Sequence, residues 1–97
     1  QKYMIKRIES GISAKSLEID YLFNVRDYAN SLDINGVVYT KNDGSVKIIA
    51  EGEEENLKEF IEKVKENNLL HPIENFYVLW EEPLGKFKDF SILDEKK

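Results

Sequence analysis

The sequence predicts a small α+β domain whose elements follow the order β-α-β-β-α-β. Two segments carry apolar residues at helical spacing, several short segments are rich in β-branched and aromatic residues, and an Asp-Gly turn joins the middle pair of strands. This order gives a four-stranded antiparallel sheet with both helices on one face. The last segment adds a fifth strand at one edge or remains an irregular edge segment.

The expected elements are short and closely spaced along the chain. Strands are expected at residues 3–12, 37–40, 45–51 and 76–80, helices at residues 17–32 and 53–66, and the final edge segment at residues 87–93. In the first helix, an apolar stripe is expected from Ile19, Leu22, Phe23, Ala29 and Leu32. Ser16 is the expected N-cap of that helix, and residues 33–36 end it with turn chemistry.

The second half of the chain gives the clearest helical signal. Its apolar residues Leu57, Phe60, Ile61 and Val64 repeat at i, i+3, i+4 and i+7. Gly52 is expected to end the strand before this helix, and residues 11–16 are expected to form a small-residue loop. The aromatic residues are expected mostly in the strand core: Phe76, Tyr77, Trp80, Phe87 and Phe90. Together these segments make the ferredoxin-like plan, which many unrelated functions share.

Composition limits the function classes. A chain of 97 residues is predicted to form one domain, residues 1–93, with a polar tail at residues 94–97. The net charge of −5 argues against a nucleic-acid partner, which would need clustered basic residues. The chain has no cysteine and one histidine, His71, so no metal site or cofactor is predicted. No apolar run is long enough for a membrane span and the start is not a signal peptide, so the cytoplasm is the expected location.

One stretch resembles a known family. Residues 35–46 read Asn-Gly-Val-Val-Tyr-Thr-Lys-Asn-Asp-Gly-Ser-Val and look like the second signature of the acylphosphatase family, Gly-Trp-Val-x-Asn-x-x-Asp-Gly-x-Val. The Ala-Glu-Gly at residues 50–52 and the ending at residues 78–92 are also similar, so the resemblance covers residues 33–93. The resemblance implies the same fold and a hydrolase of carboxyl-phosphate anhydrides that needs no metal or cofactor.

The first signature of that family is degenerate here. It reads Gly-x-Val-Gln-Gly-Val-x-Phe-Arg, and an ungapped count from Gly36 places it on residues 14–22. Of its two glycines, which let backbone amides close round a phosphate, the second becomes Glu18, and Asp20 adds another acid in the same stretch. The Arg that clamps the phosphate becomes Leu22. In the second signature the Asn that orients the attacking water becomes Thr40.

Other residues offer weaker candidates. Residues 11–16 superficially resemble a phosphate loop without its second glycine, and leave Lys15 and Ser16 as weak phosphate-binding residues, with a plain polar loop as the alternative. Arg26 lies one helical turn beyond Leu22, where a surface role is favoured. Glu51 and residues 53–55 are expected to be a solvated helix start rather than a cation site.

The leading prediction is therefore an acylphosphatase-like domain that is catalytically inactive. It would serve as a binding or interaction module, alone or inside a larger protein, with phosphate, a small anion or a protein as its partner. Loss of a preorganised donor costs roughly a hundredfold to a thousandfold in rate, which is why the replacements favour inactivity. The alternative is an active acylphosphatase. A third hypothesis is a small-ligand regulatory domain of unrelated ancestry. Neither nucleic acid nor a membrane is predicted as a partner.

Overall fold

The computed structural model describes residues 4–14, 17, 19–66 and 73–93, and it confirms the predicted fold class. The elements, in chain order, are β1 (Ile5–Ala14), α1 (Ile19–Ser31), β2 (Asn35–Thr40), β3 (Val46–Glu53), α2 (Glu54–Glu66), β4 (Ile73–Glu81) and β5 (Phe90–Ile92). Several predicted features lie outside the described residues: the Ser16 cap, the end of the second helix at residues 67–68, His71, and the tail at residues 94–97.

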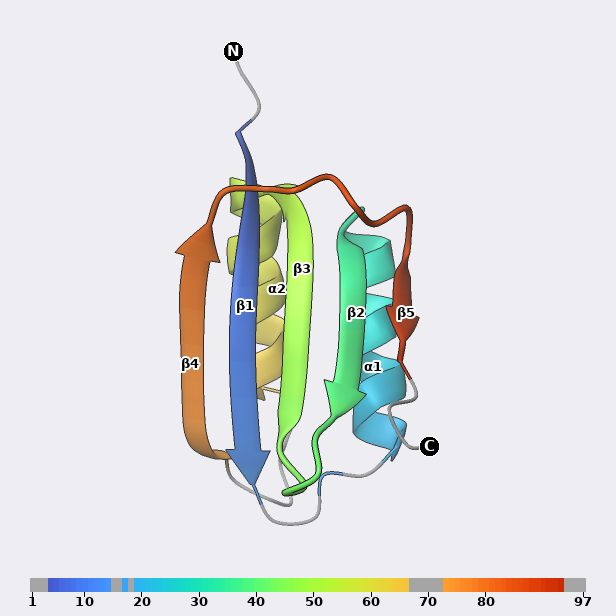
Figure 1. The fold of residues 1–97 in the computed structure, drawn as a ribbon, viewed down its shortest axis with the longest axis vertical. Helices are drawn as coiled ribbons and strands as arrows, with labels where there is room; N and C mark the ends of the chain where they lie inside the picture. The colour runs from blue at the N-terminus through green and yellow to red at the C-terminus, as the bar shows by residue number, and fades with distance from the viewer. Residues whose placement is uncertain (1–3, 15–16, 18, 67–72, 94–97) are drawn as a thin grey trace.

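The sheet has five strands in the order β4-β1-β3-β2-β5. β1 pairs antiparallel with both β3 and β4, and β2 pairs antiparallel with β3. The fifth edge strand is confirmed, but β5 runs parallel to β2, so the sheet is mixed. The reason is visible in Figure 1, where the chain leaves β4, crosses the ends of β1 and β3, and enters β5 in the same direction as β2.

Both helices cover the same face of the sheet, as predicted (Figure 1). The core lies between them and the sheet, and its fully buried large side chains are Ile8, Ile12, Val25, Ile34, Val38, Val46, Ile48, Leu57, Phe60 and Val64. Every second residue of β1, β2 and β3 supplies this core, as expected for strands with one buried face. Neither of the two described helices lies on the other face of the sheet, which is called the helix-free face below. No described helix is long and apolar enough to cross a membrane.

Two glycines predicted to break strands lie inside them. Gly11 pairs with Lys47 and Tyr77 in the middle of the sheet, so the loop predicted at residues 11–16 is wrong for residues 11–14. Gly52 pairs with Lys6, and β3 continues through it. At each glycine, a neighbouring side chain occupies the room that a Cβ would need: Tyr77 at Gly11 and Ile34 at Gly52.

Some side-chain environments also differ from the predictions. In α1, Ile19 and Phe23 are exposed (53% and 41%), and the stripe that packs on the sheet is Tyr21, Leu22, Val25 and Ala29. In β4, neither Tyr77 nor Trp80 is a core residue. Tyr77 lies over Gly11 on the face of the sheet away from both helices, and Trp80 lies on an edge strand with only β1 beside it. Phe90 is buried as predicted and packs edge-on against Phe60.

Two backbone hydrogen bonds and one left-handed residue shape the turn after α1. Ile34 N–H donates to the Ala29 carbonyl (2.9 Å) and Asp33 N–H donates to the Asn30 carbonyl (3.3 Å), which is the Schellman arrangement. Asp33 occupies its left-handed position, with φ of 56°. This cap fixes where β2 begins, and hence where Thr40 lies at its far end.

Candidate functional site

Two strands end, and the first helix begins, at one end of the sheet. β1 and β2 finish there and α1 begins there (Figure 1). Thr40 is the last residue of β2 and is exposed, while Ala14 ends β1. Ala14, Thr40 and the start of α1 therefore lie at the same end of the sheet, with β3 between β1 and β2.

Leu22 points into the core. Its exposed fraction is 6%, and it belongs to the cluster that joins α1 to the sheet. An apolar side chain there cannot hold a phosphate, so Leu22 serves packing in this chain. Arg26, one turn further, binds Asp27 (3.2 Å) and lies over the Phe23 ring (5.1 Å). Both of those contacts hold Arg26 on the surface of α1.

The turn after Thr40 is tightly tied. Lys41 N–H donates to the Ser45 carbonyl (2.7 Å), and Gly44 N–H, at φ of 89°, donates to the Lys41 carbonyl (2.9 Å). Asp43 accepts hydrogen bonds from the backbone N–H and hydroxyl of Ser45 (2.9 and 2.6 Å), which lower the pKa of its carboxyl. The hairpin signal at residues 41–44 is thus confirmed, and the turn holds Thr40 and Lys41 in place.

The residues between β1 and α1 are only partly described. Lys15, Ser16 and Glu18, which include both weak phosphate-binding candidates, lie outside the described residues. Asp20 is exposed in the first turn of α1. Gly11 does not belong to a phosphate loop, because it lies within β1 and pairs with Lys47 of β3.

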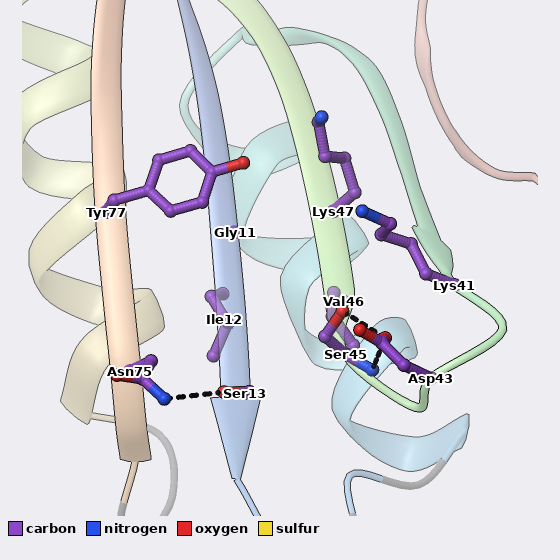
Figure 2. Close-up of a pocket in the computed structure, with 10 residues that line it drawn as sticks. All are labelled: Gly11, Ile12, Ser13, Lys41, Asp43, Ser45, Val46, Lys47, Asn75 and Tyr77. Carbon is purple, nitrogen blue, oxygen red and sulfur yellow. Dashed lines mark hydrogen bonds between the residues drawn. The ribbon is translucent and has the colours of Figure 1, made fainter.

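A pocket that the sequence did not predict opens on the helix-free face of the sheet, beside the turn between β2 and β3 (Figure 2). Its volume is about 200 Å³, and its lining is Gly11, Ile12, Ser13, Lys41, Asp43, Ser45, Val46, Lys47, Asn75 and Tyr77. The Tyr77 ring crosses from β4 over Gly11, and the two lysines approach from the β2–β3 side. Alternation along β1 was the available signal, since Arg7, Glu9, Gly11 and Ser13 follow one another at every second position.

One ion pair lies beside this pocket. Lys47 Nζ contacts a Glu9 carboxylate oxygen at 2.6 Å across the β1–β3 pairing. The hydrogen bond between them raises the pKa of Lys47 and lowers that of Glu9. Lys41, by contrast, forms no ion pair within the described part of the chain.

Glu51 is a structural anchor and not part of a solvated helix start. Its carboxylate is 7% exposed and accepts the backbone N–H groups of Leu84 (2.7 Å) and Gly85 (3.0 Å) and the guanidinium of Arg7 (3.1 Å). Burial alone would raise the pKa of Glu51, but these donors outweigh it and hold the pKa below its usual value. Glu54, by contrast, starts α2 and pairs with Lys58. Among the described residues no group of three acidic or histidine side chains could hold a metal ion.

The fold defines the class of protein, a small α+β domain with two helices on one face of a five-stranded mixed sheet. The family model for acylphosphatase matches residues 18–92. The acylphosphatase of Caldanaerobacter subterraneus subsp. tengcongensis is 34% identical over 89 residues, covering 92% of this chain and 99% of its own. That of Salinibacter ruber is 30% identical over 87 residues, covering 90% and 92%. The chain belongs to the acylphosphatase family.

Solved structures agree with this assignment. The crystal structure of acylphosphatase from Bacillus subtilis has a TM-score of 0.84 at 25% identity, and the match covers 94% of this chain and all of that one. Full-length HypF has a TM-score of 0.81 at 25% identity, covering 97% of this chain but 12% of HypF. The same fold thus occurs as a separate protein and within a much larger one.

Proposed function

We propose that this protein hydrolyses acyl phosphates to a carboxylate and inorganic phosphate without a metal or cofactor. The observation that carries the proposal is its likeness to acylphosphatases that span nearly its whole length, including the sheet end where Thr40 lies. In the reaction, water attacks phosphorus, the bond from phosphorus to the acyl oxygen breaks, and the carboxylate leaves with that electron pair. This proposal replaces inactivity as the leading hypothesis.

The roles differ from those the family signatures imply. The Thr40 hydroxyl, which is exposed at the end of β2, is proposed to hold the attacking water. The Lys41 ammonium, next along the chain and without an ion pair in the described residues, is proposed to offset the charge of the phosphate. Lys15 and Ser16 are proposed to bind the phosphate from the segment between β1 and α1. Because Leu22 supplies no guanidinium, we expect a rate about a hundredfold to a thousandfold below that of a complete site.

A second candidate function is binding without turnover. The specific observation in its favour is Leu22, whose burial leaves the position of the phosphate-clamping Arg apolar. In that case residues 1–93 would act as one phosphate- or protein-binding module. The match to a small share of HypF supports such a role within a larger protein.

Phosphate release from benzoyl phosphate separates the two candidates. The first predicts saturable turnover above the spontaneous rate, reduced by Thr40→Ala and by Lys41→Ala. Asn42→Ala, in the same turn but outside both proposed roles, is the matched control. Saturable phosphate binding with no turnover in the wild type supports the second candidate, and neither binding nor turnover would reject both.

A further inference from the structure

β4 is an edge strand, and no other described strand pairs with its outer side (Figure 1). The carbonyl of Tyr77 accepts a hydrogen bond from the hydroxyl of Ser10 in β1 (2.8 Å), so the backbone N–H and C=O of Tyr77 point inward. Along a strand, the backbone groups of successive residues point to alternate sides. The N–H and C=O groups of Phe76, Val78 and Trp80 therefore point outward, where a further strand can bind them.

Apolar side chains are exposed on both faces of this edge. Tyr77 (46% exposed) and Leu79 (51%) lie on the helix-free face, whereas Trp80 (43%) lies on the same face as the helices, opposite the buried Ile8. Edge strands usually avoid further pairing through lysine, proline or an inward-pointing charge. Residues 75–80 contain no charged residue and no proline, so this edge favours the addition of an apolar strand.

The sequence of β4 is complementary to its own reverse. When two copies of β4 pair antiparallel about an axis at Val78, their outward-pointing backbone groups face one another. The facing residues in this register are Val78 with Val78, Phe76 with Trp80, Tyr77 with Leu79, and Asn75 with Glu81. Apolar residues thus face apolar residues, and an amide donor faces a carboxylate. An axis one or two residues earlier instead places Glu74 opposite an apolar side chain, so the register at Val78 is the better matched.

Charged groups lie at both ends of the apolar part of β4. At one end, Lys65 Nζ of α2 lies 5.6 Å from the centroid of the Phe76 ring and forms no ion pair within the described residues. At the other end, Trp80 lines a hollow whose charged residues, among those described, are Lys6, Glu54, Glu81 and Glu82. The carboxylates of this hollow outnumber its ammonium group, although Glu54 also binds Lys58 (3.4 Å) and Glu81 binds Arg7 (3.2 Å).

The register centred on Val78 brings these charges together. Because the two aromatic rings face one another across the pair, each Lys65 reaches the hollow of the other copy and approaches Glu54 and Glu82 there. Glu82 also falls opposite Glu74, and the Lys65 ammonium offsets the repulsion between these two acids. Twofold symmetry repeats the contact at the other end of the pair. Such exposed charges select the partner and the register more than they add affinity.

We propose that β4 joins two copies of this chain into a twofold dimer by antiparallel pairing about Val78. One continuous sheet then runs through both copies, with the described helices of both on one face. The exposed parts of Tyr77, Leu79 and Trp80 amount to roughly 250 Å² per copy, given about 150–250 Å² for a whole aromatic side chain. Because stable complexes bury about 1,200 Å² or more, this dimer is weak and reversible. Its formation is independent of the proposed hydrolysis.

Single-cysteine variants report the register directly, because the chain has no cysteine of its own. Facing residues of an antiparallel pair have Cα atoms about 5 Å apart, within the roughly 4.4–6.8 Å that a disulfide spans. Val78→Cys is expected to form disulfide-linked dimers in air at least about tenfold faster than the matched control Asn75→Cys, whose two cysteines would lie about 20 Å apart. Equal rates in these two variants, or faster crosslinking in Tyr77→Cys than in Val78→Cys, would overturn the proposed pairing.

Sedimentation equilibrium between about 10 μM and about 1 mM measures the association. The wild type is expected to dimerise reversibly over this range, and the emission of its single tryptophan, Trp80, should shift to shorter wavelength as it does. Leu79→Lys places a charge opposite Tyr77 and should raise the dissociation constant about tenfold or more, with the fold verified by circular dichroism.

Leu93→Lys is the matched control for the association, because Leu93 is 47% exposed and follows β5 at the opposite edge of the sheet. Its dissociation constant should equal that of the wild type. A wild type that is monomeric at about 1 mM would leave this edge to a strand of another protein and overturn the proposal. An equal loss of association in Leu79→Lys and Leu93→Lys would also overturn it.

Discussion

Replacement of Glu51 by glutamine tests the anchor that holds the segment between β4 and β5 across the sheet. The carboxylate is 7% exposed and accepts two backbone N–H groups, from Leu84 and Gly85, as well as the Arg7 guanidinium. Glutamine keeps one acceptor oxygen but places an amide donor against one of those N–H groups and removes the charge opposite Arg7. Removal of one partner from a buried ion pair costs about 3–5 kcal/mol, and glutamine retains part of the bonding, so about 3 kcal/mol is expected.

Urea denaturation at neutral pH measures this cost. With a dependence of about 1–3 kcal/mol per molar urea, a loss of about 3 kcal/mol should lower the midpoint by roughly 1–3 M. Glu81→Gln is the matched control, because Glu81 binds the same Arg7 (3.2 Å) but is 38% exposed. Such a solvent-screened pair contributes less than about 1 kcal/mol. Equal losses in the two variants would refute the reasoning.

The pH dependence gives a second check on Glu51. Its pKa is lower in the folded protein than in the unfolded chain, so its stabilisation is complete above the unfolded value and is lost as pH falls through the folded value. The difference in unfolding free energy between wild type and Glu51→Gln should therefore be constant near neutral pH and shrink below about pH 4. Faster hydrogen exchange at the Leu84 and Gly85 amides should accompany the substitution. Unchanged exchange there would contradict the anchoring role.

Three other substitutions have expected effects on stability that thermal unfolding would measure. Asp33→Gly relieves a left-handed backbone (φ of 56°) and should stabilise the protein by about 0.5 kcal/mol; a loss of stability would count against the cap described. Gly36→Ala should be strongly destabilising, because φ is 150° and the added Cβ would overlap the Ile49 backbone, and a neutral result would contradict the β2–β3 register. Leu22→Arg places a charge in the core and should cost several kcal/mol, whereas little change would show that this position can reach solvent.

The sequence predicted the element order well, since the helical spacing of α2 and the turn before β3 are local signals. It misplaced strand ends at Gly11 and Gly52, because glycine normally weakens a strand. At Gly11 the Tyr77 ring occupies the free space, and at Gly52 the Ile34 side chain would lie 3.2 Å from an added Cβ. These contacts depend on which strands become neighbours, and the residues themselves do not reveal that.

The sequence predicts only part of the candidate site, because it does not reveal which strands become neighbours. Motif spacing placed Thr40 at the sheet end and Leu22 at the family's Arg position. The sequence does not predict the pocket on the helix-free face, because Tyr77 and Lys47 look like ordinary strand residues until the strand order β4-β1-β3 brings them together. Glu51 was interpreted as solvated, since its partners Leu84 and Gly85 come from a segment with no regular structure.

The most direct test of the proposed function is hydrolysis of benzoyl phosphate by the wild type and by Thr40→Asn, which restores the side chain of the family signature. The account predicts measurable, saturable turnover in the wild type and an increase of about tenfold or more in Thr40→Asn, since an amide holds the attacking water better than a hydroxyl. Spontaneous hydrolysis alone in both folded proteins would contradict it.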